Sequence, residues 1–126
     1  MELRVLPDAL AVCRLPTDAH WPMPTNAGFY SVTRTDSELS VVCRQDVAPA
    51  GAGAQVETGW RGLEVAGPLD FGMVGVLANL SNLLAAAQVS LFVISTYDTD
   101  YILVRSEALA SAVEALQQGG HTITPA

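Results

Sequence analysis

The sequence predicts an α+β fold in which a ferredoxin-like βαββαβ unit follows a strand-rich first half. In the second half, apolar runs of strand length alternate with two stretches of helical period, and turn residues separate them. In the first half, the apolar runs are short and prolines interrupt the segments between them. We therefore expect antiparallel sheets with helices packed on one face, and a division into residues 1–55 and 56–126.

The second half opens with a predicted strand at Trp60–Ala66, which Gly67-Pro68 ends. A helix is predicted over residues 73–87, because its apolar side chains recur at i, i+4, i+7 and i+11. The predicted stripe consists of Val76, Leu80, Leu83 and Ala87.

A second strand is predicted at Leu91–Thr96, where a nearly continuous apolar run is typical of a central strand covered on both faces. Residues 97–100 have turn chemistry, and a return strand is expected at Tyr101–Arg105. Ser106 is expected to cap the second helix, and Gly119-Gly120 to stop it. The core face of that helix is predicted at Leu109, Val113 and Leu116. The final strand is predicted at His121–Thr124.

The first half is predicted to form strands and no long helix. Prolines make a long helix at residues 17–28 unfavourable, and the glycine- and alanine-rich residues 49–54 indicate a flexible connector. The expected strands are Leu3–Leu6, Ala9–Leu15 and a hairpin of Phe29–Thr33 with Glu38–Arg44 around Thr35-Asp36-Ser37.

The composition excludes several classes of function. Thirteen acidic residues face six arginines and no lysine, giving a formal net charge of −7. This balance disfavours nucleic acids and anionic membranes as partners, and it excludes enzymes that depend on a lysine. The charge-free run from Phe71 to Tyr97 is interpreted as helix followed by strand, not as a membrane span, and the N-terminus lacks the pattern of a signal peptide.

The cysteines and histidines do not indicate a metal site. Cys13 and Cys43 lie in short apolar runs, which is typical of free buried thiols, with a disulfide or redox pair as the alternative. There is no CxxC motif, and His20 and His121 stand in unrelated contexts. We expect neither a metal nor a cofactor.

Two segments resemble the ACT-domain family: Gly67-Pro68-Leu69-Asp70-Phe71 and Ile94-Ser95-Thr96-Tyr97-Asp98-Thr99-Asp100-Tyr101. The similarity is greatest to the branch that includes the cytosolic arginine sensors (CASTOR proteins) and small bacterial relatives. Val74 stands where the common signature of the family has a proline. The resemblance implies a tandem of ACT-like units, the first with degenerate helices. It also implies a cytoplasmic, homodimeric, non-catalytic regulator that binds an amino acid and acts on another protein.

The residues themselves suit a zwitterion. Backbone amides at a helix start can bind a carboxylate, and glycines allow a close approach to the backbone. Carboxylates on the turn can bind an ammonium group, and aromatic or thioether side chains can form an apolar wall. The candidate ligand-binding residues are Asp70, Phe71, Gly72, Met73, Val74, Gly75, Thr96, Tyr97, Asp98, Thr99 and Asp100.

Alternatives remain open at this point. Asp70, Asp98 and Asp100 could serve only local backbone, and the chain could be a structural or interaction module with a vestigial pocket. Catalysis by Ser95 and His121 is not expected, because no serine stands in a GxSxG motif and no aspartate is placed to orient the histidine.

Overall fold

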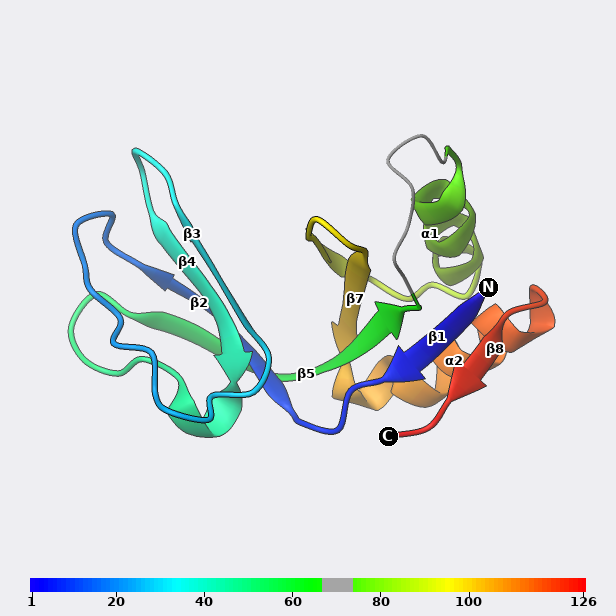
Figure 1. The fold of residues 1–126 in the computed structure, drawn as a ribbon, viewed down its shortest axis with the longest axis horizontal. Coiled ribbons are helices and arrows are strands. Elements are labelled where there is room, and N and C mark those ends of the chain that lie inside the picture. Colours follow the sequence, from blue (N-terminus) through cyan, green and yellow to red (C-terminus); the bar gives the residue numbers. More distant parts are fainter. Residues whose placement is uncertain (67–73) are drawn as a thin grey trace. The chain divides into compact units, whose positions relative to one another are not determined.

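The computed structural model describes residues 1–66 and 74–126, which form two compact units (Figure 1). Unit 1 comprises residues 1–7 and 61–126, and unit 2 comprises residues 8–60. Strand β5 (Gln55–Val65) contributes its first residues to unit 2 and its last residues to unit 1. Each unit is described below by itself.

The sheet of unit 1 has the strand order β8-β1-β5-β7-β6. β1 (Glu2–Val5) pairs antiparallel with β5, and β6 (Phe92–Ser95) pairs antiparallel with β7 (Asp100–Arg105). β8 (Thr122–Thr124) pairs with β1 in parallel. The first strand of the chain, which the sequence pattern grouped with the first half, thus lies inside the sheet of unit 1.

Two helices cover one face of this sheet: α1 (Val76–Ala86) and α2 (Leu109–Gln118). Alternate strand residues such as Leu63 and Val65 share a buried core with Leu80 and Leu84 of α1 and with side chains of α2. The α+β class, the order of elements and the packing of helices on one face are therefore confirmed.

Two local expectations in unit 1 need correction. Leu84, not Ala87, lies at the centre of the buried stripe of α1, because the helix turns by 3.6 residues and Ala87 is already beyond its end. Ser106 opens a short 3-10 turn (η2, Ser106–Ala108), and α2 begins only at Leu109, so Ser106 is not its capping residue.

The prediction of a central, doubly covered strand at residues 91–96 is wrong. Among the described residues β6 pairs only with β7 and lies at the end of the sheet, where Phe92, Val93 and Ile94 are half-buried. A continuous apolar run indicates that a strand is present, but it carries no information about whether a second neighbour pairs with it.

Unit 2 is an antiparallel sheet with the order β3-β4-β2-β5. Its strands are β2 (Leu10–Leu15), β3 (Tyr30–Arg34) and β4 (Leu39–Arg44), so the predicted β3–β4 hairpin is confirmed. Residues 8–60, all of which the structure describes, contain no α-helix and one 3-10 turn, η1 (Gln45–Val47). The register of β2 against β5 shifts between Leu10 and Val12, and Gly59 on the β5 side of this bulge has φ of 81°.

The core of unit 2 is covered by an irregular segment instead of a helix. Trp21 packs edge-on against Tyr30, with ring centroids 5.7 Å apart, and is buried against side chains of β2 and β4. Those strand side chains are Ala11, Cys13, Leu15, Leu39, Val41 and Cys43.

Candidate functional site

The acidic turn between β6 and β7 is closed by its two threonines. The Thr96 N–H donates to the Thr99 carbonyl at 2.8 Å, and the Thr99 N–H donates to Thr96 Oγ1 at 3.3 Å. Tyr97 is 81% exposed, and Asp98 is exposed beside it. The local hydrogen bonds thus use the threonines and leave the ring and the carboxylate facing solvent.

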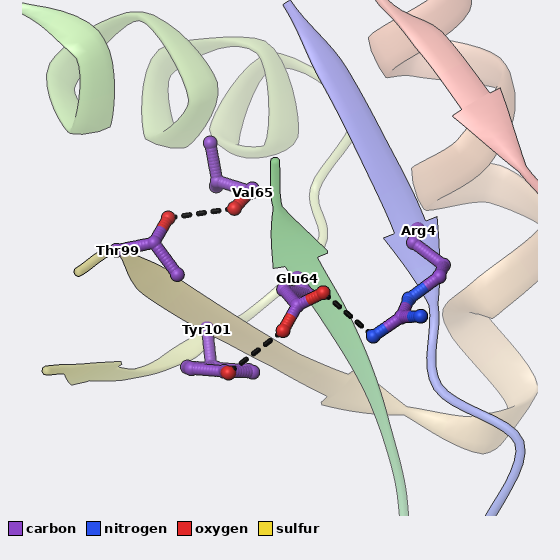
Figure 2. Close-up of polar contacts among 5 residues, drawn as sticks. All are labelled: Arg4, Glu64, Val65, Thr99 and Tyr101. Carbon is purple, nitrogen blue, oxygen red and sulfur yellow. Dashed lines mark hydrogen bonds and ion pairs between the residues drawn. The ribbon is translucent and has the colours of Figure 1, made fainter. Parts of the chain in front are cut away.

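Thr99 also ties this turn to the end of β5. Its side chain is only 7% exposed, and Oγ1 donates a hydrogen bond of 2.6 Å to the carbonyl of Val65 (Figure 2). Val65 is the last residue of β5, two positions before the segment 67–73. The bond therefore fixes the turn beside the point at which the chain leaves the sheet.

The two turn carboxylates differ. Ser95 and Asp100 are directly opposite each other in the β6–β7 ladder, and Ser95 Oγ donates to Asp100 Oδ1 at 2.5 Å. Among the described residues, none donates a hydrogen bond to the Asp98 carboxylate. The Asp100 carboxylate is thus bound within the ladder, whereas Asp98 is exposed.

Gly75 precedes α1 with φ of 83°. Among the described residues, a side-chain carbon placed on Gly75 would meet nothing within 4 Å. Val74 is 91% exposed, and the first turn of α1 contains no acidic residue. The first backbone N–H groups of a helix lack intrahelical acceptors, so this end favours an anionic group.

The predicted site residues are therefore described only in part. Thr96 to Asp100 form one tethered turn, and Val74 and Gly75 lead into α1. Asp70, Phe71, Gly72 and Met73 lie outside the described residues.

Next to the turn, a polar network that the sequence did not reveal crosses three strands (Figure 2). Glu64 of β5 forms an ion pair with Arg4 of β1 at 2.7 Å and accepts a hydrogen bond of 2.7 Å from the Tyr101 hydroxyl of β7. Burial, followed by the hydrogen bond to Glu64 and its negative charge, raises the pKa of Tyr101 to about 12. The three residues are far apart in the chain, so only the strand register could have indicated the network.

The side chains considered for catalysis do not act together. Ser95 is bound to Asp100, whereas His121 Nε2 lies 2.8 Å from Asn79 Oδ1 of α1. Burial lowers the pKa of His121. Within the described ranges, no three His, Cys, Asp or Glu side chains gather in a way that could hold a metal ion, and no helix is long and apolar enough to cross a membrane.

Comparisons of the sequence match two family models. The model described as an ACT domain matches residues 55–118, and a second model, described as an N-terminal domain, matches residues 8–51. The cytosolic arginine sensor for mTORC1 subunit 1 of Homo sapiens is 30% identical over 103 residues, and that of Bos taurus is 38% identical over 60 residues. These matches cover 77% and 47% of this chain, but only 31% and 18% of the relatives, so the chain spans about a third of their length or less.

Solved structures give longer matches. A protein of Agobacterium tumefaciens is 33% identical, with a TM-score of 0.85 over 99% of this chain and 92% of its own. The regulatory subunit of aspartate kinase from Thermus thermophilus shares the fold at 10% identity, with a TM-score of 0.60 over 89% of this chain and 93% of its own. With an ACT model over half its length and this arrangement of strands and helices, the chain belongs to the ACT-domain family.

Proposed function

We propose that this chain is a non-catalytic regulatory protein that binds a free amino acid where residues 70–75 meet the turn 96–100 in unit 1. The observation that carries the proposal is the Thr99–Val65 hydrogen bond, which holds an acidic turn beside the exit of the chain toward the start of α1. The family membership supports a regulatory role, since the curated relatives include a cytosolic arginine sensor.

Each group of the ligand has a partner of matching chemistry. Asp98 binds the ammonium group, because its carboxylate is exposed and receives no hydrogen bond from the described residues. The amides at Val74 and Gly75 bind the carboxylate at the start of α1. The exposed ring of Tyr97 covers the side chain, and Asp70, Phe71, Gly72 and Met73 complete the pocket.

The expected affinity is modest. Charge-assisted hydrogen bonds contribute about 1.5–3 kcal/mol each. Two or three of them with some apolar burial correspond to a dissociation constant on the order of micromolar, which suits sensing of a metabolite.

Isothermal titration calorimetry against each of the twenty amino acids tests the proposal. We expect heat from one ligand or from a small, chemically related set, and its loss in Asp98→Asn. The matched control is Asp36→Asn, since Asp36 is an exposed acidic residue in the β3–β4 turn of unit 2. No response to any amino acid at millimolar concentration, or equal loss of binding in both variants, would contradict the proposal.

A second candidate is a protein-interaction module. Val74 and Tyr97, at 91% and 81% exposed, are apolar or aromatic side chains that a partner surface could bury. The absence of binding heat with every amino acid would favour this candidate.

We further propose that the chain is cytoplasmic and homodimeric. Light scattering coupled to size-exclusion chromatography tests the second point, with an expected mass of twice 13.3 kDa.

A further inference from the structure

Unit 2 holds two thiols side by side in its core. In the β2–β4 ladder Cys13 is opposite Val41, and Cys43 is opposite Ala11, so the cysteines are diagonal neighbours on one face of the sheet. Cys13 is 2% exposed, Cys43 is fully buried, and neither forms a disulfide. This site lies within residues 8–60 and does not depend on the proposed amino-acid site.

The two thiols are chemically unequal. A hydrogen bond from Cys43 lowers the pKa of Cys13, although burial opposes the change, and the same hydrogen bond together with burial raises the pKa of Cys43. Because the thiolate is the reactive form, these directions favour Cys13, which is also the slightly more exposed of the two, as the nucleophile of the pair.

The cover over this pair is an irregular segment. Residues 16–29 carry Trp21 over the core, and the Arg34 guanidinium donates to the carbonyls of Thr17 and Ala19, while the Thr17 hydroxyl donates to the carbonyl of Thr35. These hydrogen bonds are exposed to solvent. An irregular segment held in part by exposed hydrogen bonds opens locally more readily than helices and central strands, and such opening would give small reagents access to the thiols.

We propose that Cys13 and Cys43 are an oxidation site that forms a reversible intramolecular disulfide with hydrogen peroxide. The Cys13 thiolate attacks one peroxide oxygen, the O–O bond breaks, and the departing hydroxide takes the proton of Cys43 to form water. The Cys43 sulfur then attacks the Cys13 sulfenic acid, and the S–O bond breaks. The released hydroxide takes up from solvent the proton that Cys13 gave up on ionising and leaves as a second water, so two thiols are oxidised while one peroxide is reduced.

The register explains why the bond is reversible. Diagonal neighbours in an antiparallel pair have Cα atoms about 7–8 Å apart, whereas disulfides span about 4.4–6.8 Å. Closing the bond must draw β2 and β4 together, and strained disulfides are reduced more easily than relaxed ones.

Mass spectrometry of the full chain before and after peroxide treatment tests the proposal. Under non-reducing conditions, trypsin should yield residues 5–14 linked to residues 35–44, because cleavage follows Arg4, Arg14, Arg34 and Arg44. We expect a mass lower by two hydrogens, loss of both titratable thiols in the denatured protein, and recovery of both with dithiothreitol.

Single variants test the assigned roles. Cys43→Ser should leave a sulfenic acid on Cys13 that dimedone traps, whereas Cys13→Ser should react at least about tenfold more slowly because its remaining thiol stays protonated. Arg34→Gln should accelerate oxidation of the otherwise native pair by loosening the cover. Retention of both thiols after peroxide, disulfides between molecules only, or faster reaction of Cys43 than of Cys13 would overturn the proposal.

Discussion

Units 1 and 2 each contain a β-sheet, but different kinds of chain segment cover the two sheets. In unit 1, the apolar faces of α1 and α2 bury the sheet and supply leucines to a continuous core. In unit 2, irregular segments carry Trp21, Ala19, Val47, Ala48 and Ala54 onto the sheet. The first cover derives its stability from buried apolar area, and the second depends in addition on polar contacts that hold an irregular backbone in place.

The comparison shows that a sheet can be covered either by helices or by irregular backbone. A helix forms most of its backbone hydrogen bonds internally, whereas the backbone N–H and C=O groups of an irregular segment must bond to side chains or water. Arg34 serves the segment 16–29 in this way by binding two of its carbonyls. The two tryptophans, Trp21 and Trp60, lie in unit 2, and the two α-helices of the described residues lie in unit 1. Fluorescence and circular dichroism at 222 nm therefore report separately on the two units.

The largest effect is expected from Leu84→Ala in the helical cover of unit 1. Leu84 is fully buried on the face of α1 that packs on the sheet. Its truncation should therefore lower the free energy of unfolding by about 3 kcal/mol, through lost burial and a residual cavity. Urea unfolding followed at 222 nm measures the loss, with Asn82→Ala on the exposed face of α1 as the control. A change of less than about 1 kcal/mol would show that the helix contributes little to the core.

A smaller loss is expected from Arg34→Ala in unit 2. Removing two hydrogen bonds to the covering segment should lower the free energy of unfolding by only about 1–2 kcal/mol, because water can bind both carbonyls in place of the guanidinium. Tryptophan fluorescence during urea unfolding measures the effect. Arg14→Ala is the control, since Arg14 donates one hydrogen bond to the Ser37 carbonyl and does not reach the segment 16–29; equal losses in the two variants would contradict the assigned role of Arg34.

The face of unit 1 opposite the helices should respond to alkaline pH. Tyr101→Phe removes the hydrogen bond to Glu64 and should cost about 1 kcal/mol at neutral pH. Because the folded state raises the pKa of Tyr101 from 10 to about 12, its contribution is fully present below pH 10 and is lost as the pH rises from 10 to 12. Urea midpoints at a series of pH values should fall more steeply in this window for the wild-type chain than for Tyr101→Phe.

The smallest effect concerns the end of α1. Gln88 has φ of 60°, a left-handed conformation that glycine adopts without steric cost. Gln88→Gly should therefore stabilise unit 1 by about 0.5 kcal/mol, whereas Ala87→Gly, at φ of −87°, should destabilise it. Thermal unfolding at 222 nm measures both, and a loss of stability in both variants would show that side-chain contacts of Gln88 outweigh its backbone strain.

Much of the fold could be predicted from local patterns. The spacing of Leu80 and Leu83 indicated α1, Gly119-Gly120 marked the end of α2, and Thr35-Asp36-Ser37 marked the turn of the β3–β4 hairpin. The acidic turn was found from its residues, but its tether to Val65 was not. The division at residue 55, the pocket and its residues remain predictions.

The sequence alone determined which segments form helices and strands, because periodicity and turn chemistry act within a few residues. Only the tertiary structure decided how strands become neighbours: β1 lies between β5 and β8, and β6 pairs with β7 alone among the described strands. It also decided which polar side chains bind one another, since Ser95 donates to Asp100 while Asp98 is exposed. These outcomes depend on pairing between residues far apart in the chain, and a one-residue change of register would alter every such contact.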